Sequence, residues 1–132
     1  MNQKTILALG AALGALAVIL GASGAHAWKP LLESMNRVST FELANRYHFY
    51  HAIVMVLCGV LASENQKILS WAAALLFFGV LFFSGSLYVM SFFQLPKLGP
   101  ITPLGGVCLI AGWTLMVIAV VTKKPSKKLD GY

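Results

Sequence analysis

Four long apolar stretches, separated by short polar segments, dominate the chain. They cover residues 6–27, 46–62, 68–93 and 102–122. About 20 predominantly apolar helical residues cross the ~30 Å hydrocarbon core of a bilayer. No two-residue alternation of the kind that marks strands competes with this pattern. The sequence therefore predicts an all-α integral membrane protein, with four transmembrane helices in a compact bundle that forms a single membrane domain over residues 1–132.

The polar segments predict where helices begin. Pro30 suits the first turn of a short interfacial helix between the first two spans, because its missing N–H costs little there. Ser39 and Glu42 have the spacing of a capping box, so the second helix is expected to begin near Thr40. Thr102 is expected to act as the N-cap of the fourth helix.

The first apolar stretch also has features of a secretory signal peptide. Lys4 precedes the apolar run, and Ala25-His26-Ala27 has the form of a cleavage site. The run is longer than the ~7–15 residues of a typical signal-peptide core. We therefore expect this segment to be retained as the first span.

Charge changes the picture in two ways. Charged residues make up only 11% of the chain, against roughly 25% in soluble domains, so lipid is expected to replace water around most of it. The net charge is +6, and four of the ten basic residues lie in the tail, residues 123–132. A basic run beside a span sets topology and meets anionic lipid. Nucleic acid is therefore not expected as a partner.

The distribution of basic residues predicts the orientation. Four spans place both termini and the 63–67 turn on one side, with six basic residues: Lys4, Lys67 and the four tail lysines. The opposite side holds Lys29, Arg37, Arg46 and Lys97. The positive-inside rule then places both termini, with the basic tail, in the cytoplasm. The expected location is a bacterial cytoplasmic (inner) membrane.

In this orientation, the polar residues of all four spans converge on the outer half of the bundle. The candidate cluster consists of His26, Arg46, Tyr47, His48, Tyr50, His51, Ser84, Ser86, Tyr88 and Thr102. Clustered neutral imidazoles are good ligands, so a metal or haem site at His26, His48 and His51 is one hypothesis. The favoured hypothesis is structural: these side chains mark the membrane boundary and form hydrogen bonds between helices.

Glycines in the spans predict close helix packing, since small residues let backbones approach. The candidates are Gly10, Gly14, Gly21, Gly24, Gly85, Gly105, Gly106 and Gly112. Trp28 and Trp71 lie at predicted interfaces and are typical of an aromatic belt. Trp113 lies too deep for such a belt and is expected to pack within the bundle or against a partner.

At these segments the sequence resembles the transmembrane-protein-256-like family, also called domain of unknown function 423. The matching motifs appear in the family's order and cover nearly the whole chain: residues 21–26 (GASGAH), 47–52 (YHFYHA), 83–88 (FSGSLY), 101–106 (ITPLGG) and 111–113 (AGW). Ser23 stands where the family's first motif usually has an aromatic residue. The resemblance implies four spans and a retained first segment, and it implies no particular reaction or ligand.

Missing motifs narrow the functional hypotheses. No Asp or Glu lies in the apolar part of a span, and no catalytic arrangement or phosphate loop is present in the sequence, so an enzyme is not expected. We expect a non-enzymatic accessory, assembly or membrane-organising component, with a protein partner or homo-oligomer, bound lipid and no cofactor. The alternatives are a small oligomeric transporter or channel, and a metal- or haem-binding redox subunit.

Overall fold

The computed structural model describes residues 1–62, 66–93 and 95–122, and these residues fold into helices without strands. The elements are α1 (Gln3–Ala25), α2 (Lys29–Ser34), α3 (Val38–Leu61), α4 (Gln66–Phe92), the 3-10 turn η1 (Pro96–Leu98) and α5 (Ile101–Val121). The expected all-α architecture is confirmed. The predicted tail, residues 123–132, lies outside the described residues.

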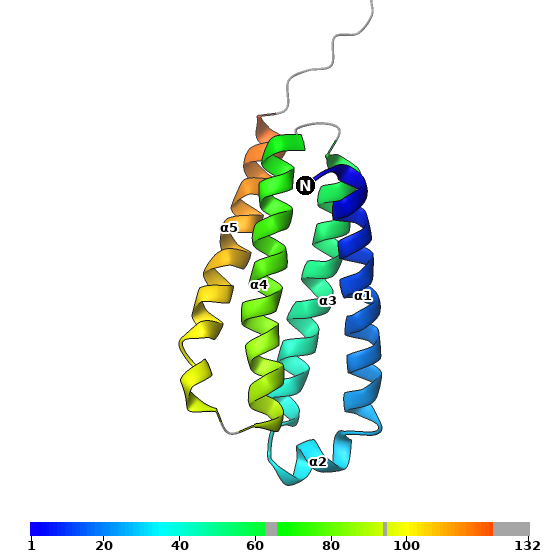
Figure 1. The fold of residues 1–132 in the computed structure, drawn as a ribbon, viewed down its shortest axis with the longest axis vertical. Coiled ribbons are helices and arrows are strands. Elements are labelled where there is room, and N and C mark those ends of the chain that lie inside the picture. Colours follow the sequence, from blue (N-terminus) through cyan, green and yellow to red (C-terminus); the bar gives the residue numbers. More distant parts are fainter. Residues whose placement is uncertain (63–65, 94, 123–132) are drawn as a thin grey trace, which may run out of the picture.

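The four long helices run up and down in sequence order and lie in an open row (Figure 1). Large interfaces join α1 to α3, α3 to α4, and α4 to α5, whereas α1 touches α4 only slightly. α1 and α5 form no extended interface within the described residues. The arrangement therefore differs from the compact bundle expected from the sequence. Association in lipid has little hydrophobic drive, so the two outer helices lose little by keeping their outer faces exposed.

The row gives the molecule two distinct ends. The start of α1, the end of α3, the start of α4 and the end of α5 lie together at one end (Figure 1). α2 and η1 lie at the other, here called the α2 end. The described chain ends thus share one side of the molecule, as the up-and-down order of the long helices requires.

Two helices begin earlier than the capping patterns predicted. α3 begins at Val38, with Arg37 as its N-cap residue and no side-chain capping bond. Asn36 has φ 52°, a left-handed conformation that asparagine tolerates well, and it turns the chain directly into α3. The predicted Ser39–Glu42 capping box is therefore wrong. α5 likewise begins at Ile101 without a side-chain cap, so Thr102 is not the cap residue.

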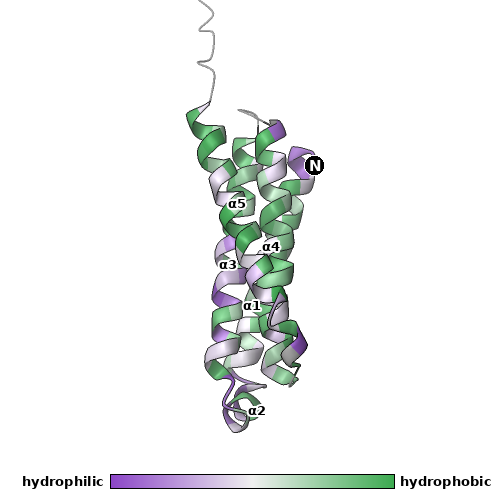
Figure 2. Cartoon of the chain, turned by 90° about the vertical axis from the view of Figure 1, so that its left-hand side faces the viewer, coloured by the Kyte–Doolittle hydropathy of each residue, from purple (hydrophilic) through white to green (hydrophobic). Residues whose placement is uncertain are grey.

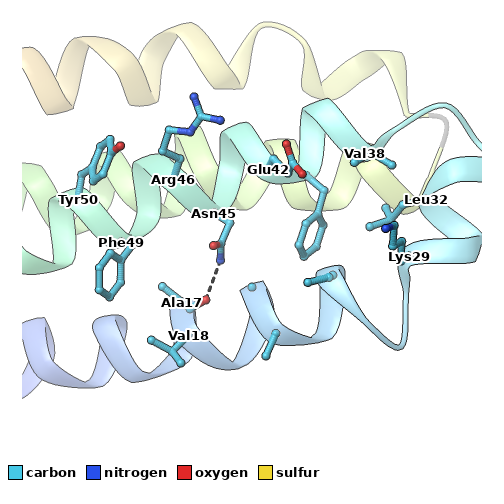
Figure 3. Close-up of a pocket in the computed structure, with 15 residues that line it drawn as sticks. Ala17, Val18, Lys29, Leu32, Val38, Glu42, Asn45, Arg46, Phe49 and Tyr50 are labelled. Carbon is cyan, nitrogen blue, oxygen red and sulfur yellow. Dashed lines mark hydrogen bonds between the residues drawn. The ribbon is translucent and has the colours of Figure 1, made fainter.

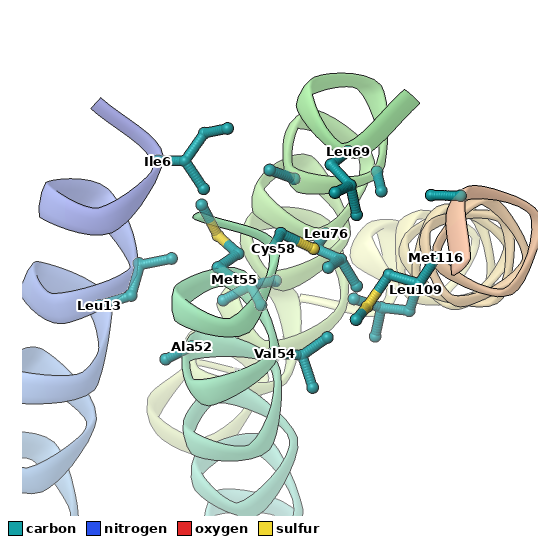
Figure 4. Packing of buried hydrophobic residues seen from close by; sticks show 14 residues of the cluster. Ile6, Leu13, Ala52, Val54, Met55, Cys58, Leu69, Leu76, Leu109 and Met116 are labelled. Atoms are coloured by element: carbon teal, nitrogen blue, oxygen red, sulfur yellow. The ribbon is translucent and has the colours of Figure 1, made fainter. Parts of the chain in front are cut away.

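The hydrophobic core fills the half of the molecule away from the α2 end. Leu13 from α1, Met55 and Cys58 from α3, Leu76 from α4 and Met116 from α5 belong to one cluster of buried residues (Figure 4). Both cysteines of the chain are free. Apolar packing dominates this half. The buried polar side chains of the described residues lie toward the α2 end: His48, His51, Ser84, Ser86 and Ser91.

Three helices in the described residues are long and apolar enough to cross a membrane: α1, α4 from Lys67 onward, and α5. α3 is long enough at 24 residues but carries more polar side chains. Hydrophilic positions mark the half of α3 nearer the α2 end, while its other half is largely hydrophobic (Figure 2). Whether α3 can cross a membrane thus depends on what its polar side chains contact.

Candidate functional site

Asn45 connects three helices at the centre of the polar half. Its Nδ2 donates to the carbonyl oxygen of Ala17 on α1 at 2.7 Å and to the hydroxyl of Tyr88 on α4 at 3.0 Å. Gly21 makes room for it, since a Cβ there would stand 2.8 Å from the Asn45 Oδ1 atom. Asn45 was not among the predicted cluster residues. The available signal was its spacing: Asn45 stands three residues before His48 on α3, so the two side chains share a helix face.

Tyr88 continues this connection to His48. The Tyr88 hydroxyl lies 3.3 Å from Nδ1 of His48. Because that hydroxyl accepts a bond from Asn45, its own proton is available to donate to His48. This arrangement leaves the His48 proton on Nε2, which is buried and has no hydrogen-bond partner among the described residues. The Ser84 hydroxyl, one turn before Tyr88 on α4, is buried without a partner as well.

His51 uses both of its ring nitrogens within the protein. Nδ1–H donates to the backbone oxygen of Tyr47 at 2.6 Å, and Nε2 accepts from the indole N–H of Trp113 at 3.3 Å. These two bonds fix one neutral tautomer. They also explain why Trp113 lies deep in α5, where its N–H reaches across to α3.

Ser86 and Thr102 connect α4 to α5. The Ser86 hydroxyl donates to the backbone oxygen of Phe83 at 2.9 Å, and its oxygen lies 2.6 Å from the Thr102 hydroxyl. Thr102 therefore donates to Ser86 instead of capping α5. The pair forms a short bond between two helices that otherwise meet through apolar side chains and glycine.

The remaining members of the predicted cluster lie at its edge. His26, Arg46, Tyr47 and Tyr50 are exposed, and His26 is the C-cap residue of α1. The structure thus brings together His48, His51, Ser84, Ser86, Tyr88 and Thr102 at the buried helix contacts. The described residues contain no group of three or more His, Cys, Asp or Glu side chains placed to hold a metal ion.

Aromatic rings close the α2 end. Trp28 packs edge-on against Phe41 and Phe92, with ring centroids 6.0 and 5.3 Å apart, and Phe41 lies 5.1 Å from Tyr88. Trp28 therefore packs between helix ends, where the sequence predicted a belt residue. Gly24 makes room for the Phe41 ring, because a Cβ at position 24 would collide with that ring.

The predicted packing glycines differ in how closely a neighbouring helix approaches them. Added Cβ atoms would collide with the partner helix at Gly10, Gly21, Gly24, Gly105 and Gly112. At Gly14 and Gly106 the nearest atoms lie at ordinary van der Waals distances of 3.9 and 3.8 Å. Nothing lies within 4 Å of a Cβ built at Gly85. Close approach is thus concentrated at the α1–α3 and α4–α5 interfaces.

A groove runs between α1 and α3 near the α2 end, with a volume of about 700 Å³ (Figure 3). We call it the α1–α3 groove. Small α1 residues form one wall and polar and aromatic α3 residues the other, and α2 contributes Lys29 and Leu32. Pockets for small ligands commonly measure ~300–1,000 Å³. The groove is therefore large enough for part of an organic molecule.

The fold and the site define a class: an all-helical membrane protein whose buried polar side chains bond one helix to another. The family model described as "Protein of unknown function (DUF423)" matches residues 20–106. The chain belongs to this family, as the resemblance in its motifs predicted. The matched range includes every residue of the predicted polar cluster.

The names of the relatives describe them as membrane proteins. The chain is 40% identical over 121 residues to the UPF0382 membrane protein YwdK of Bacillus subtilis (strain 168), covering 90% of this chain and 98% of the relative. It is 42% identical over 117 residues to a UPF0382 membrane protein of Staphylococcus epidermidis (strain ATCC 12228 / FDA PCI 1200), covering 89% and 95%. No solved structure matches the chain.

Proposed function

We propose that this protein is a four-span, non-enzymatic component of the bacterial cytoplasmic (inner) membrane, with both termini in the cytoplasm. It acts as an accessory, assembly or membrane-organising subunit, in contact with a second copy or another polypeptide. The observation that carries the proposal is the use of buried polar side chains as links between helices.

The fourth span is the first part of this proposal. α3 packs along α1 on one side and α4 on the other, and both neighbours are apolar enough to cross a bilayer. Its 24 residues correspond to about 36 Å of helix, enough for a ~30 Å core. Asn45 and His51 bond to neighbouring helices, which reduces the cost of placing them in lipid.

The structural role is the second part. Intramembrane polar groups that serve substrates or ions have to stay available to them. Here Asn45, His51, Ser86 and Thr102 are committed to interhelical bonds. Such bonds position helices, which is the work of a scaffold or accessory subunit.

Native mass spectrometry of the protein gently extracted from its own membrane tests this function. The expected spectrum contains a second copy of the chain or a further polypeptide. A bare monomer would contradict the accessory role. Flux into proteoliposomes is the matching test of the transporter alternative: tight vesicles are expected, and solute-specific uptake would replace the proposed function with transport.

A further inference from the structure

We propose that the interface between α3 and α4 binds one buried water molecule, which accepts hydrogen bonds from Nε2–H of His48 and from the hydroxyl of Ser84. This site goes beyond the proposed function and does not depend on it, because α3 and α4 share a large interface whatever else the protein contacts. The chemistry of the ligand follows from the two side chains, which are both neutral and both have a hydrogen to donate.

Two buried polar atoms without partners identify the site. His48 is 3% exposed and Ser84 is 0% exposed. Within the described residues, Nε2 of His48 and Oγ of Ser84 are the buried side-chain atoms that make no hydrogen bond. Burying an unbonded polar group is costly. Two such atoms on neighbouring helices therefore indicate a partner that they share.

The contacts between α3 and α4 place the two side chains at the same level. The Tyr47 ring packs against the Phe83 ring, with centroids 4.7 Å apart. The Tyr88 hydroxyl lies 3.3 Å from Nδ1 of His48. Ser84 follows Phe83 directly and stands four residues before Tyr88, so it shares the Tyr88 face of α4. These two contacts bracket Ser84 on the face of α4 that meets His48.

The Ser84 hydroxyl lacks the bond that serines in helices usually make. The other two buried serines of the described residues, Ser86 and Ser91, donate to backbone oxygens three and four residues earlier on α4. Ser84 makes no such bond with the described residues, although a helix offers that oxygen to any serine. Its hydroxyl is therefore available to a partner at the interface.

A water molecule suits this pair better than a direct bond or an ion. No hydrogen bond joins Nε2 of His48 to Oγ of Ser84 in the described residues, and polar groups beyond bonding distance are commonly bridged by water. A water oxygen can accept from both donors, and its own hydrogens remain to donate to helix backbone oxygens, which keep a second lone pair. Donor hydrogens repel a cation, and two neutral groups do not offset the charge of a buried anion.

The three histidines of the chain supply the test and its controls. Full-length protein with labelled ring nitrogens is studied in lipid bilayers by solid-state NMR, at a pH where imidazole is neutral. Polarisation is transferred from water to these nitrogens, and His48→Gln assigns the His48 signals. We expect transfer to Nε2 of His48 at mixing times that give none to His51. His51 is the matched control, since it is 6% exposed but bonds through both nitrogens within the protein. His26, which is exposed, should receive polarisation from bulk water.

Two serine variants test the second partner of the water. Ser84→Ala removes one of its bonds and should abolish the transfer to His48. Ser91→Ala should leave the transfer unchanged, because Ser91 is equally buried but bonds to the Leu87 oxygen. Matching circular dichroism spectra check that both variants keep their helices.

Three results would overturn the proposal. The first is the absence of transfer to His48 in the unmodified protein. The second is equal transfer in the Ser84→Ala and Ser91→Ala proteins, since the water would then not be shared with Ser84. The third is a His48 signal that shifts in Ser84→Ala without any transfer from water, which would replace the water with a direct bond between the two side chains.

Discussion

At the scale of single residues, the polar side chains act in pairs across helix interfaces. His51 and Trp113 form one such pair, and Asn45 and Tyr88 another. An unpaired polar group in an apolar interior is costly. Removing one partner therefore loses the hydrogen bond and also leaves the other partner unpaired. Substituting one partner should therefore affect stability far more than the same change at an exposed position.

Trp113→Phe tests the first pair. It removes the indole N–H and leaves Nε2 of His51 without a donor, which should lower the free energy of unfolding by about 1 kcal/mol. Trp71→Phe is the matched control, because Trp71 is 63% exposed. Thermal unfolding in detergent measures both. Equal midpoints for the two variants would show that the His51–Trp113 bond adds nothing.

Tyr88→Phe tests the second pair. The change removes the hydroxyl that contacts both Asn45 and His48, and a loss of about 1 kcal/mol is expected. Tyr50→Phe removes the same atom from a side chain that is 54% exposed and should be close to neutral. Denaturant or thermal unfolding of the two variants side by side gives the comparison. A Tyr88→Phe protein as stable as the Tyr50→Phe protein would argue against a structural role for the link.

At the scale of helices, the order and approximate position of the long helices were predictable, and their contacts were not. Apolar runs bounded by polar turns located all four long helices, although α3 begins at Val38, eight residues before its apolar run at position 46. The partners of Asn45 and Trp113 depend on the rotation of each helix about its axis. That rotation is set by close contacts such as Phe41 at Gly24, which no single stretch of sequence specifies.

The glycines give the sharpest test at this scale. A Cβ at Gly105 would collide with the backbone of Phe83, which cannot move aside as a side chain can, whereas Gly85 has open space. Gly105→Ala should destabilise the α4–α5 interface by about 1–3 kcal/mol. Gly85→Ala should be neutral or stabilising by up to about 1 kcal/mol, because alanine favours helix. The reverse order in thermal unfolding would contradict the packing described for α4 and α5.

At the scale of the whole molecule, the open row of helices leaves α1 and α5 as edges. Leu104, Val107, Ile110 and Val117 on α5 are all exposed and apolar, as they would be against lipid or a partner helix. The polar half of α3 lies in the middle of the row, bonded to α1, α4 and α5. The proposed four-span topology therefore requires that α3 crosses the membrane together with α1 and α4.

Cysteine labelling in intact protoplasts tests this crossing most directly. Single cysteines are placed at Ser34 in α2 and Lys97 in η1, both exposed and both at the α2 end, and at Lys4 near the other end. Cys58 and Cys108 are first replaced by alanine. With four spans, a membrane-impermeant maleimide should label Ser34→Cys and Lys97→Cys from outside, and Lys4→Cys only after lysis. Labelling of Ser34→Cys and Lys97→Cys from opposite sides would mean that α3 does not span, which would contradict the account.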